Sequence, residues 1–130
     1  MSCISIAQEK YLKDEDDIEV FSKKITLLFS KNKPLEAFSE LSLYWPLAET
    51  EVELLKEKTV KSINAVEDRF GKEKGIVKIS TKKIGDVAIR VTYFVKYNIL
   101  ALRYIYTYFH SEEGWILNAF KWDDDFEEEF

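Results

Sequence analysis

The amino-acid sequence predicts an α+β domain in which three N-terminal helices pack on a curved antiparallel sheet of about four strands. Hydrophobic residues recur every three or four positions up to about residue 70, and from Gly75 onward they alternate with other residues. The length of 130 residues corresponds to one domain. Because the helices precede the strands, the pattern is typical of folds with helices on one face of an antiparallel sheet.

The first two helices follow from short hydrophobic stripes. Residues 14–17 are acidic and suit the first turn of a helix that ends near Ser30. Its buried residues lie at spacings of three and four: Ile18, Phe21, Ile25 and Leu28. A second helix is predicted to begin at Pro34 and to stop at Trp45-Pro46, because proline disfavours a helical residue before it. Its expected buried face is Leu35, Phe38 and Leu41.

The third helix has the longest stripe. Thr50 and Glu53 have the spacing of a capping box, and Gly71 suits the left-handed end of a helix. The expected buried stripe is Val52, Leu55, Thr59, Ile63, Val66 and Phe70. We therefore expect one continuous helix of about twenty residues.

The second half predicts a meander of strands. A first strand over 75–84 turns at Gly85-Asp86. In the next strand, two sets of residues alternate: Val87, Ile89, Val91, Tyr93 and Val95 on one face, and Ala88, Arg90, Thr92, Phe94 and Lys96 on the other. A turn near Tyr97-Asn98 brings the next strand back, and the turn at 111–114 leads into a last strand over 115–122. The expected domain is 16–122, between a flexible N-terminus (1–15) and an acidic C-terminal tail (123–130).

The net charge of −5 comes from the tail, where six of the 24 acidic residues lie. The remaining 18 acidic residues face 19 basic ones, so the body has no positive field that favours nucleic acid. No segment has the 18–20 apolar residues that a membrane-spanning helix needs. The single cysteine, Cys3, excludes an intramolecular disulfide, and no signal peptide is visible. A cytoplasmic location is the default, although an exported form with its signal removed would have the same sequence.

The last two strands carry a family resemblance. Gly114-Trp115-Ile116-Leu117-Asn118, with Phe120 two residues on, follows the strand Arg103-Tyr104-Ile105-Tyr106. Over roughly residues 16–126 the chain resembles the nuclear-transport-factor-two-like (cystatin-like) superfamily, in particular its small bacterial members. The resemblance implies a cone in which the long helix covers a bent sheet and leaves a pocket. That superfamily includes ketosteroid isomerase-like and dehydratase-like enzymes as well as binding and dimerisation modules, so the fold does not choose a function.

Alternation places four tyrosines on the sheet face that the helices cover, and these are the ligand-pocket candidates: Tyr93, Tyr104, Tyr106 and Tyr108. They could instead form a carboxylate-plus-tyrosine catalytic site with Asp86 or Glu67. We favour packing, because the helix faces need partners of this size. An Asp–His pair is disfavoured, because the single histidine, His110, is expected at the surface beside a turn. The sequence predicts no catalytic residue, metal site or cofactor, since no clustered ligands or glycine-rich phosphate loop is present.

The opposite sheet face is the expected interface, with an unusual mixture of apolar residues and arginines: Arg90, Phe94, Arg103, Ile105, Phe120 and Trp122. Since members of the superfamily commonly dimerise through this face, we expect a homodimer. A register slip of one residue would exchange the faces.

The acidic tail has two readings, a solvated end or an electrostatic handle for a basic protein partner. From these observations we expect a non-catalytic binding module that recognises a small apolar ligand or a protein through its pocket or open sheet face. The alternative is an isomerase-like or dehydratase-like enzyme.

Overall fold

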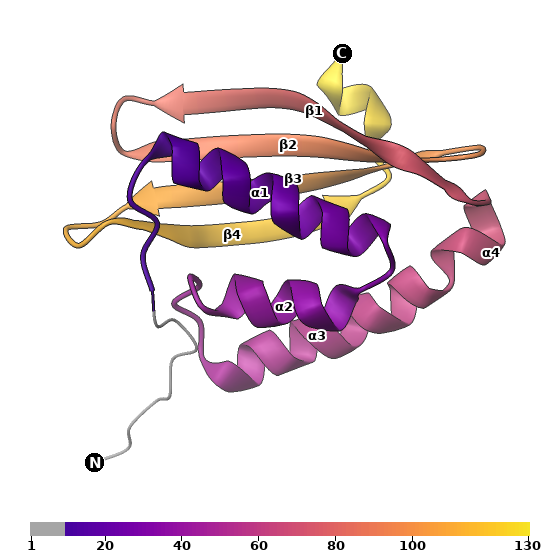
Figure 1. The fold of residues 1–130 in the computed structure, drawn as a ribbon, viewed down its shortest axis with the longest axis horizontal. Helices are drawn as coiled ribbons and strands as arrows, with labels where there is room; N and C mark the ends of the chain where they lie inside the picture. The colour runs from indigo at the N-terminus through magenta and orange to yellow at the C-terminus, as the bar shows by residue number, and fades with distance from the viewer. Residues whose placement is uncertain (1–9) are drawn as a thin grey trace.

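The computed structural model describes residues 10–130 and confirms the predicted α+β architecture (Figure 1). Four helices come first: α1 (Glu15–Ser30), α2 (Pro34–Ser42), α3 (Glu49–Asn64) and α4 (Val66–Phe70). The strands follow, and a short 3₁₀ turn ends the described chain: β1 (Glu73–Ile84), β2 (Ala88–Tyr97), β3 (Ala101–His110), β4 (Trp115–Asp123) and η1 (Phe126–Glu129). The strands form one antiparallel sheet in the order β1-β2-β3-β4. Helix α1 lies across one face of this sheet, and α2 and α3 lie next to each other on the same side (Figure 1).

The first two helices begin where the sequence predicts. The carboxylate of Asp14 caps α1 by accepting a hydrogen bond from the backbone N–H of Asp17 at 2.9 Å. Helix α2 begins at Pro34, as expected. Leu35 was predicted to be buried but is 57% exposed, because the buried face consists of residues 34, 37, 38 and 41. Leu35 lies about 100° around the helix from Pro34.

The predicted third helix is broken in two, which corrects the expectation of one continuous helix. At the break, the N–H of Ala65 bonds to the carbonyl of Ser62 at 3.2 Å, the tighter i→i+3 pattern of a 3₁₀ turn. The predicted capping box does not form either. Ala48 is the N-cap residue, and Glu53 pairs instead with Lys56 at 2.7 Å.

The register of β2 and β3 confirms the face assignment of the tyrosines. Val91 is opposite Tyr106, and Tyr93 is opposite Tyr104, so the valines and tyrosines share one side of the sheet. We call the side that packs on the helices the inner face and the opposite side the outer face. The inner face forms most of the core with the buried stripes of α1 and α2.

Strand β4 corrects the predicted position of two interface residues. Phe120 is opposite Tyr106 and Trp122 is opposite Tyr104, so both lie on the inner face rather than the outer one. The cause is a register irregularity: Tyr108 pairs with Leu117, whereas Thr107 pairs with Ala119, which leaves Asn118 as an extra residue. A β-bulge of this kind reverses the alternation beyond it. Strict period-two counting from Trp115 therefore assigned Phe120 and Trp122 to the wrong face.

The domain begins earlier than the predicted residue 16. Leu12 is 5% exposed and forms a two-bond bridge with Trp115, with N–O distances of 2.9 and 2.8 Å. Gly114 permits this approach, because a Cβ there would lie 2.9 Å from the Cβ of Tyr11 and its φ is 148°. Cys3 and the rest of residues 1–9 lie outside the described residues. Within residues 10–130, no helix combines the length and apolar character needed to cross a membrane.

Candidate functional site

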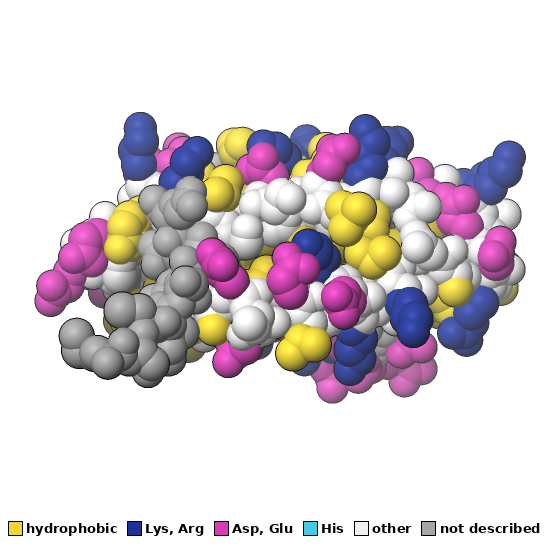
Figure 2. Space-filling model, turned by 90° about the horizontal axis from the view of Figure 1, so that it is seen from below, with side chains coloured by type: hydrophobic (Ala, Val, Ile, Leu, Met, Phe, Trp, Pro, Cys, Tyr) yellow, Lys and Arg dark blue, Asp and Glu magenta, His cyan; other side chains and the backbone are white. Residues whose placement is uncertain are grey.

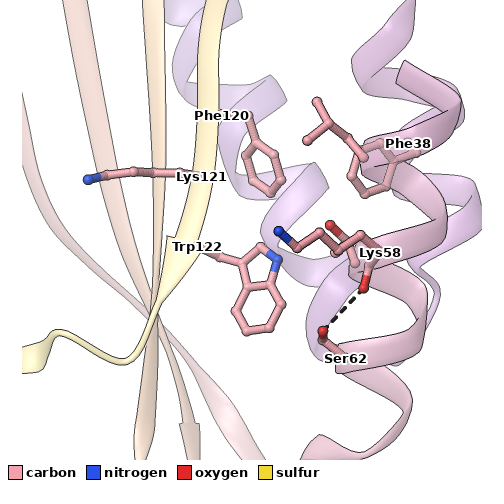
Figure 3. Close-up of a pocket in the computed structure, with 8 residues that line it drawn as sticks. Phe38, Lys58, Ser62, Phe120, Lys121 and Trp122 are labelled. Carbon is pink, nitrogen blue, oxygen red and sulfur yellow. Dashed lines mark hydrogen bonds between the residues drawn. The ribbon is translucent and has the colours of Figure 1, made fainter. Parts of the chain in front are cut away.

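A cavity of about 290 Å³ lies between α3 and β4, with Phe38 of α2 at its inner end (Figure 3). Aromatic side chains make the floor, and α3 supplies the opposite wall. The lining residues are Phe38, Leu55, Lys58, Thr59, Ser62, Phe120, Lys121 and Trp122. The volume is near the lower end of the range for small-molecule sites, roughly 300–1,000 Å³.

The bulge in β4 creates the aromatic floor, because it turns Phe120 and Trp122 toward the helices. The ring of Phe120 stacks on Phe29 with 5.4 Å between centroids and meets the edge of Phe38 at 6.0 Å. Trp122 stacks on Tyr104 with 6.2 Å between centroids. Rings held on several sides have few alternative rotamers, so the cavity is largely preformed.

The polar groups of the cavity come mainly from α3. The hydroxyl of Ser62 donates to the carbonyl of Lys58 at 3.1 Å, so its proton is already engaged. The ammonium of Lys58 extends toward Phe120 and Trp122, whereas Lys121 points away across the sheet (Figure 3). Lys58 forms no salt bridge with any residue from 10 to 130. Within residues 10–130, the cavity therefore combines apolar walls with the exposed ammonium of Lys58, which no carboxylate pairs with in a salt bridge.

Leu55 was predicted to lie in the core but is 39% exposed and lines this cavity. Lys58, Ser62 and Phe38 were not predicted as site residues from the sequence. Lys58 directly precedes Thr59, a residue of the predicted buried stripe, and therefore lies beside the buried face of the helix. This spacing was the only indication in the sequence that Lys58 lies near the core. The facing partner was not visible, because the bulge that turns Phe120 inward has no sequence signature that we recognised.

The four candidate tyrosines lie in the packed core. The hydroxyl of Tyr106 lies 2.7 Å from the hydroxyl of Thr26, and that of Tyr108 lies 2.6 Å from the hydroxyl of Ser22. Burial raises the pKa of both phenols well above the ordinary value. Tyr104 is fully buried, and its hydroxyl has no hydrogen-bond partner within the described part of the chain. None of the four lines the cavity between α3 and β4.

The carboxylate whose charge acts on Tyr93 and Tyr108 is that of Glu19, which the sequence did not predict as a site residue. The pKa of Tyr93 is raised mainly by burial and, to a smaller extent, by the charge of Glu19. Glu19 itself accepts hydrogen bonds from Lys78 at 2.5 Å and Thr81 at 2.6 Å, and thereby ties α1 to β1. These bonds give the carboxylate a structural role.

The residues named for the catalytic alternative are dispersed. The pKa of Tyr97 is raised to about 12, mainly by burial and also by the charge of Glu67. Glu67 therefore acts on a tyrosine that is not one of the four ligand-pocket candidates. His110 is exposed, as expected. Its Nδ1 lies 2.9 Å from the backbone carbonyl of Asp86, and its ring stacks on Trp115. Within residues 10–130, no three His, Cys, Asp or Glu side chains are grouped as metal ligands.

The outer face carries the other four interface candidates, and the C-terminal segment covers part of it. Arg103 is 3% exposed and binds Asp123 through two hydrogen bonds of 2.9 and 2.8 Å. A third bond of 2.7 Å joins Arg103 to Glu129. Phe126 stacks on Phe94 with 5.1 Å between centroids. The acidic tail is thus folded back onto the sheet rather than extended, although Asp124, Asp125 and Glu127 remain exposed.

Comparisons of the chain with family models, with curated proteins and with solved structures found no match. The function is therefore inferred from the cavity between α3 and β4 and from the outer face of the sheet.

Proposed function

We propose that the protein is a non-catalytic binding module of the nuclear-transport-factor-two-like kind, and that its ligand is a small apolar molecule with an anionic end. The cavity between α3 and β4 is the binding site. The observation that carries the proposal is the ammonium of Lys58, which lies without a salt bridge among residues 10–130 in a cavity walled by Phe38, Phe120 and Trp122.

The chemistry of the cavity favours an amphipathic ligand. Binding is favourable when the apolar surface of a ligand displaces water from the aromatic walls. A carboxylate placed at Lys58 forms a charge-assisted hydrogen bond that a neutral ligand lacks. The small volume favours a short chain or a single ring over a large lipid.

The enzyme alternative gains no support from its proposed residues. Tyr106 and Tyr108 are fully buried, and their hydroxyls contact Thr26 and Ser22. A homodimer through the outer face remains a prediction, and it would have to accommodate η1 on that face.

A matched ligand series tests the proposed function. Octanoate, octanol and octylamine have the same apolar chain and differ in the charge of the head group. We expect octanoate to bind about tenfold more tightly than octanol, which corresponds to about 1.4 kcal/mol, and octylamine to bind most weakly. Binding is followed by the fluorescence of Trp122, which lines the cavity, and by calorimetry.

Three variants identify the site. Lys58→Met should lower octanoate binding to the level of octanol, whereas Lys61→Met, on the same helix but outside the cavity, should leave it unchanged. Leu55→Trp should abolish binding of octanoate and octanol alike by filling the cavity. Equal affinities for octanoate and octylamine, or no saturable binding of any of the three, would show that the cavity is not the proposed site.

A further inference from the structure

The outer face has three zones that run across the strands. At one end, Phe94 and Arg103 lie under the C-terminal segment. In the middle, Lys82 of β1 is directly opposite Arg90 of β2, and Lys121 of β4 lies nearby in the same cavity. At the other end lies a row of cross-strand partners that is largely apolar and partly exposed: Ile84, Ala88, Phe109 and Ile116. On β2 the two ends are marked by Phe94 and Ala88, which are six positions apart, a distance of about 20 Å along the strand.

The middle zone has cations that the C-terminal segment does not neutralise. A cavity of about 320 Å³ here is lined by Lys82, Arg90, Lys121 and Arg103, and also by Glu128 and Glu129. Both glutamates form their salt bridges with Arg103, at 3.1 and 2.7 Å. In the described part of the chain, Lys82, Arg90 and Lys121 form no salt bridge. Like charges directly opposite on neighbouring strands are destabilising, so the pair Lys82 and Arg90 favours an added anion.

The C-terminal segment shows which chemistry this face accepts. It places carboxylates on Arg103 and an aromatic ring on Phe94. Its attachment is slight, because η1 has four residues and none of them is buried. Asp123 already occupies two N–H groups of Arg103 from within β4, so Glu128 and Glu129 share the remaining Nη1.

We propose that the outer face is a docking surface for an acidic segment of a partner protein that carries an aromatic residue, and that the segment 126–130 is its intramolecular competitor. The partner segment takes the positions of Phe126, Glu128 and Glu129 and extends over Lys82, Arg90 and Lys121. The exposed row at Ile84 and Phe109 then contacts apolar residues that flank the acidic stretch. Two observations favour a partner of this kind. The cations of the outer face complement an acidic segment, and the chain's own acidic segment already binds there.

The test uses a fluorescently labelled peptide, DDDFEEEF, and a neutral control, NNNFQQQF, with three forms of the protein. These are the full chain, a chain ending at Asp125, and a full-length double variant, Phe126→Ala with Glu129→Gln. Because a tethered segment has an effective concentration of about millimolar, both altered forms should bind DDDFEEEF at least about tenfold more tightly than the full chain. Affinity should fall with added salt, and NNNFQQQF should bind at least about tenfold more weakly than DDDFEEEF.

The residues of the middle zone supply the decisive variants. Arg90→Glu and Lys121→Glu, each in the chain ending at Asp125, should weaken binding of DDDFEEEF about tenfold or more, whereas Lys61→Glu on α3 is the matched control and should change nothing. The proposal is wrong if freeing the face does not increase peptide affinity, or if Arg90→Glu and Lys121→Glu leave it unchanged. Sedimentation of the chain ending at Asp125 completes the test. A concentration-dependent dimer would make a second copy the occupant and overturn the partner peptide.

Discussion

The two faces of one sheet use aromatic and polar side chains in different ways. On the inner face, Tyr106 and Tyr108 are fully buried, and their hydroxyls contact side chains of α1. On the outer face, residues of the C-terminal segment contact Phe94 and Arg103, while Arg90 and Lys121 remain exposed. The inner face therefore belongs to the cooperative core. The segment that covers part of the outer face comes from the end of the same chain, and none of the residues of η1 is buried.

The exposed side of the helical layer is not divided into apolar and charged zones. Leu54 of α3 is 68% exposed and Leu35 of α2 is 57% exposed, but charged side chains are interspersed with the apolar ones over this side (Figure 2). The two leucines line one shallow hollow together with charged side chains such as Lys56, Glu57 and Lys61, and a small apolar patch of this kind is ordinary at a protein surface. The comparison that matters for function is thus the one between the two faces of the sheet.

The largest expected difference between the faces is in core packing. Phe29→Ala should lower the free energy of unfolding by about 3–5 kcal/mol, because Phe29 is 1% exposed and packs against Phe38, Tyr104 and Phe120. Phe94→Ala should cost only about 1–2 kcal/mol, since the segment that covers it can detach. Urea denaturation measures both. Equal losses would show that η1 is an integral part of the core.

A smaller difference separates two tyrosines of the inner face. Tyr106→Phe should lower the free energy of unfolding by about 1 kcal/mol, because it removes the hydrogen bond to Thr26. Tyr104→Phe should leave stability unchanged or increase it, because the Tyr104 hydroxyl is buried without a partner among residues 10–130. Thermal and urea unfolding of both variants give the comparison. A loss for Tyr104→Phe as large as that for Tyr106→Phe would indicate a partner such as a buried water.

The smallest expected effect is the dependence of the outer face on pH. The hydrogen bonds from Arg103 hold the pKa of Asp123 below its ordinary value, and Arg103 stays charged because its own pKa is raised by the same contacts. Since the folded-state pKa of Asp123 is depressed, its contribution to stability is complete above the ordinary pKa of about 4 and is lost as pH falls through the folded-state value.

Asp123→Asn tests this pH dependence against Asp124→Asn, a neighbour that forms no salt bridge with any residue from 10 to 130. The unfolding midpoint of Asp123→Asn should be below that of the unmodified chain near neutral pH. The gap should close on acidification below about pH 4. A gap that persists in acid, or an equal one for Asp124→Asn, would contradict the role of the Arg103–Asp123 pair.

Local patterns predicted most of the fold but little of the candidate sites. The stripe of α1 and the alternation in β2 and β3 reflect local periodicity, so their faces could be assigned from the sequence. The break at Ala65 and the bulge at Asn118 could not, because each is a small change of hydrogen bonding that depends on what the segment packs against. The bulge turns Phe120 and Trp122 inward and so forms the cavity beside Trp122. Without knowledge of the bulge, the alternation predicts both residues on the opposite face.

By itself, the sequence determined the order of helices and strands and the inner position of the tyrosines, because both follow from periods of 3.6 and 2 along the chain. Only the tertiary structure decided the surroundings of Lys58 and the fate of the acidic tail. The sequence shows six carboxylates in residues 123–130. That two of them, Glu128 and Glu129, reach Arg103, about 25 residues earlier in the chain, depends on strand pairing that brings β3 beside β4.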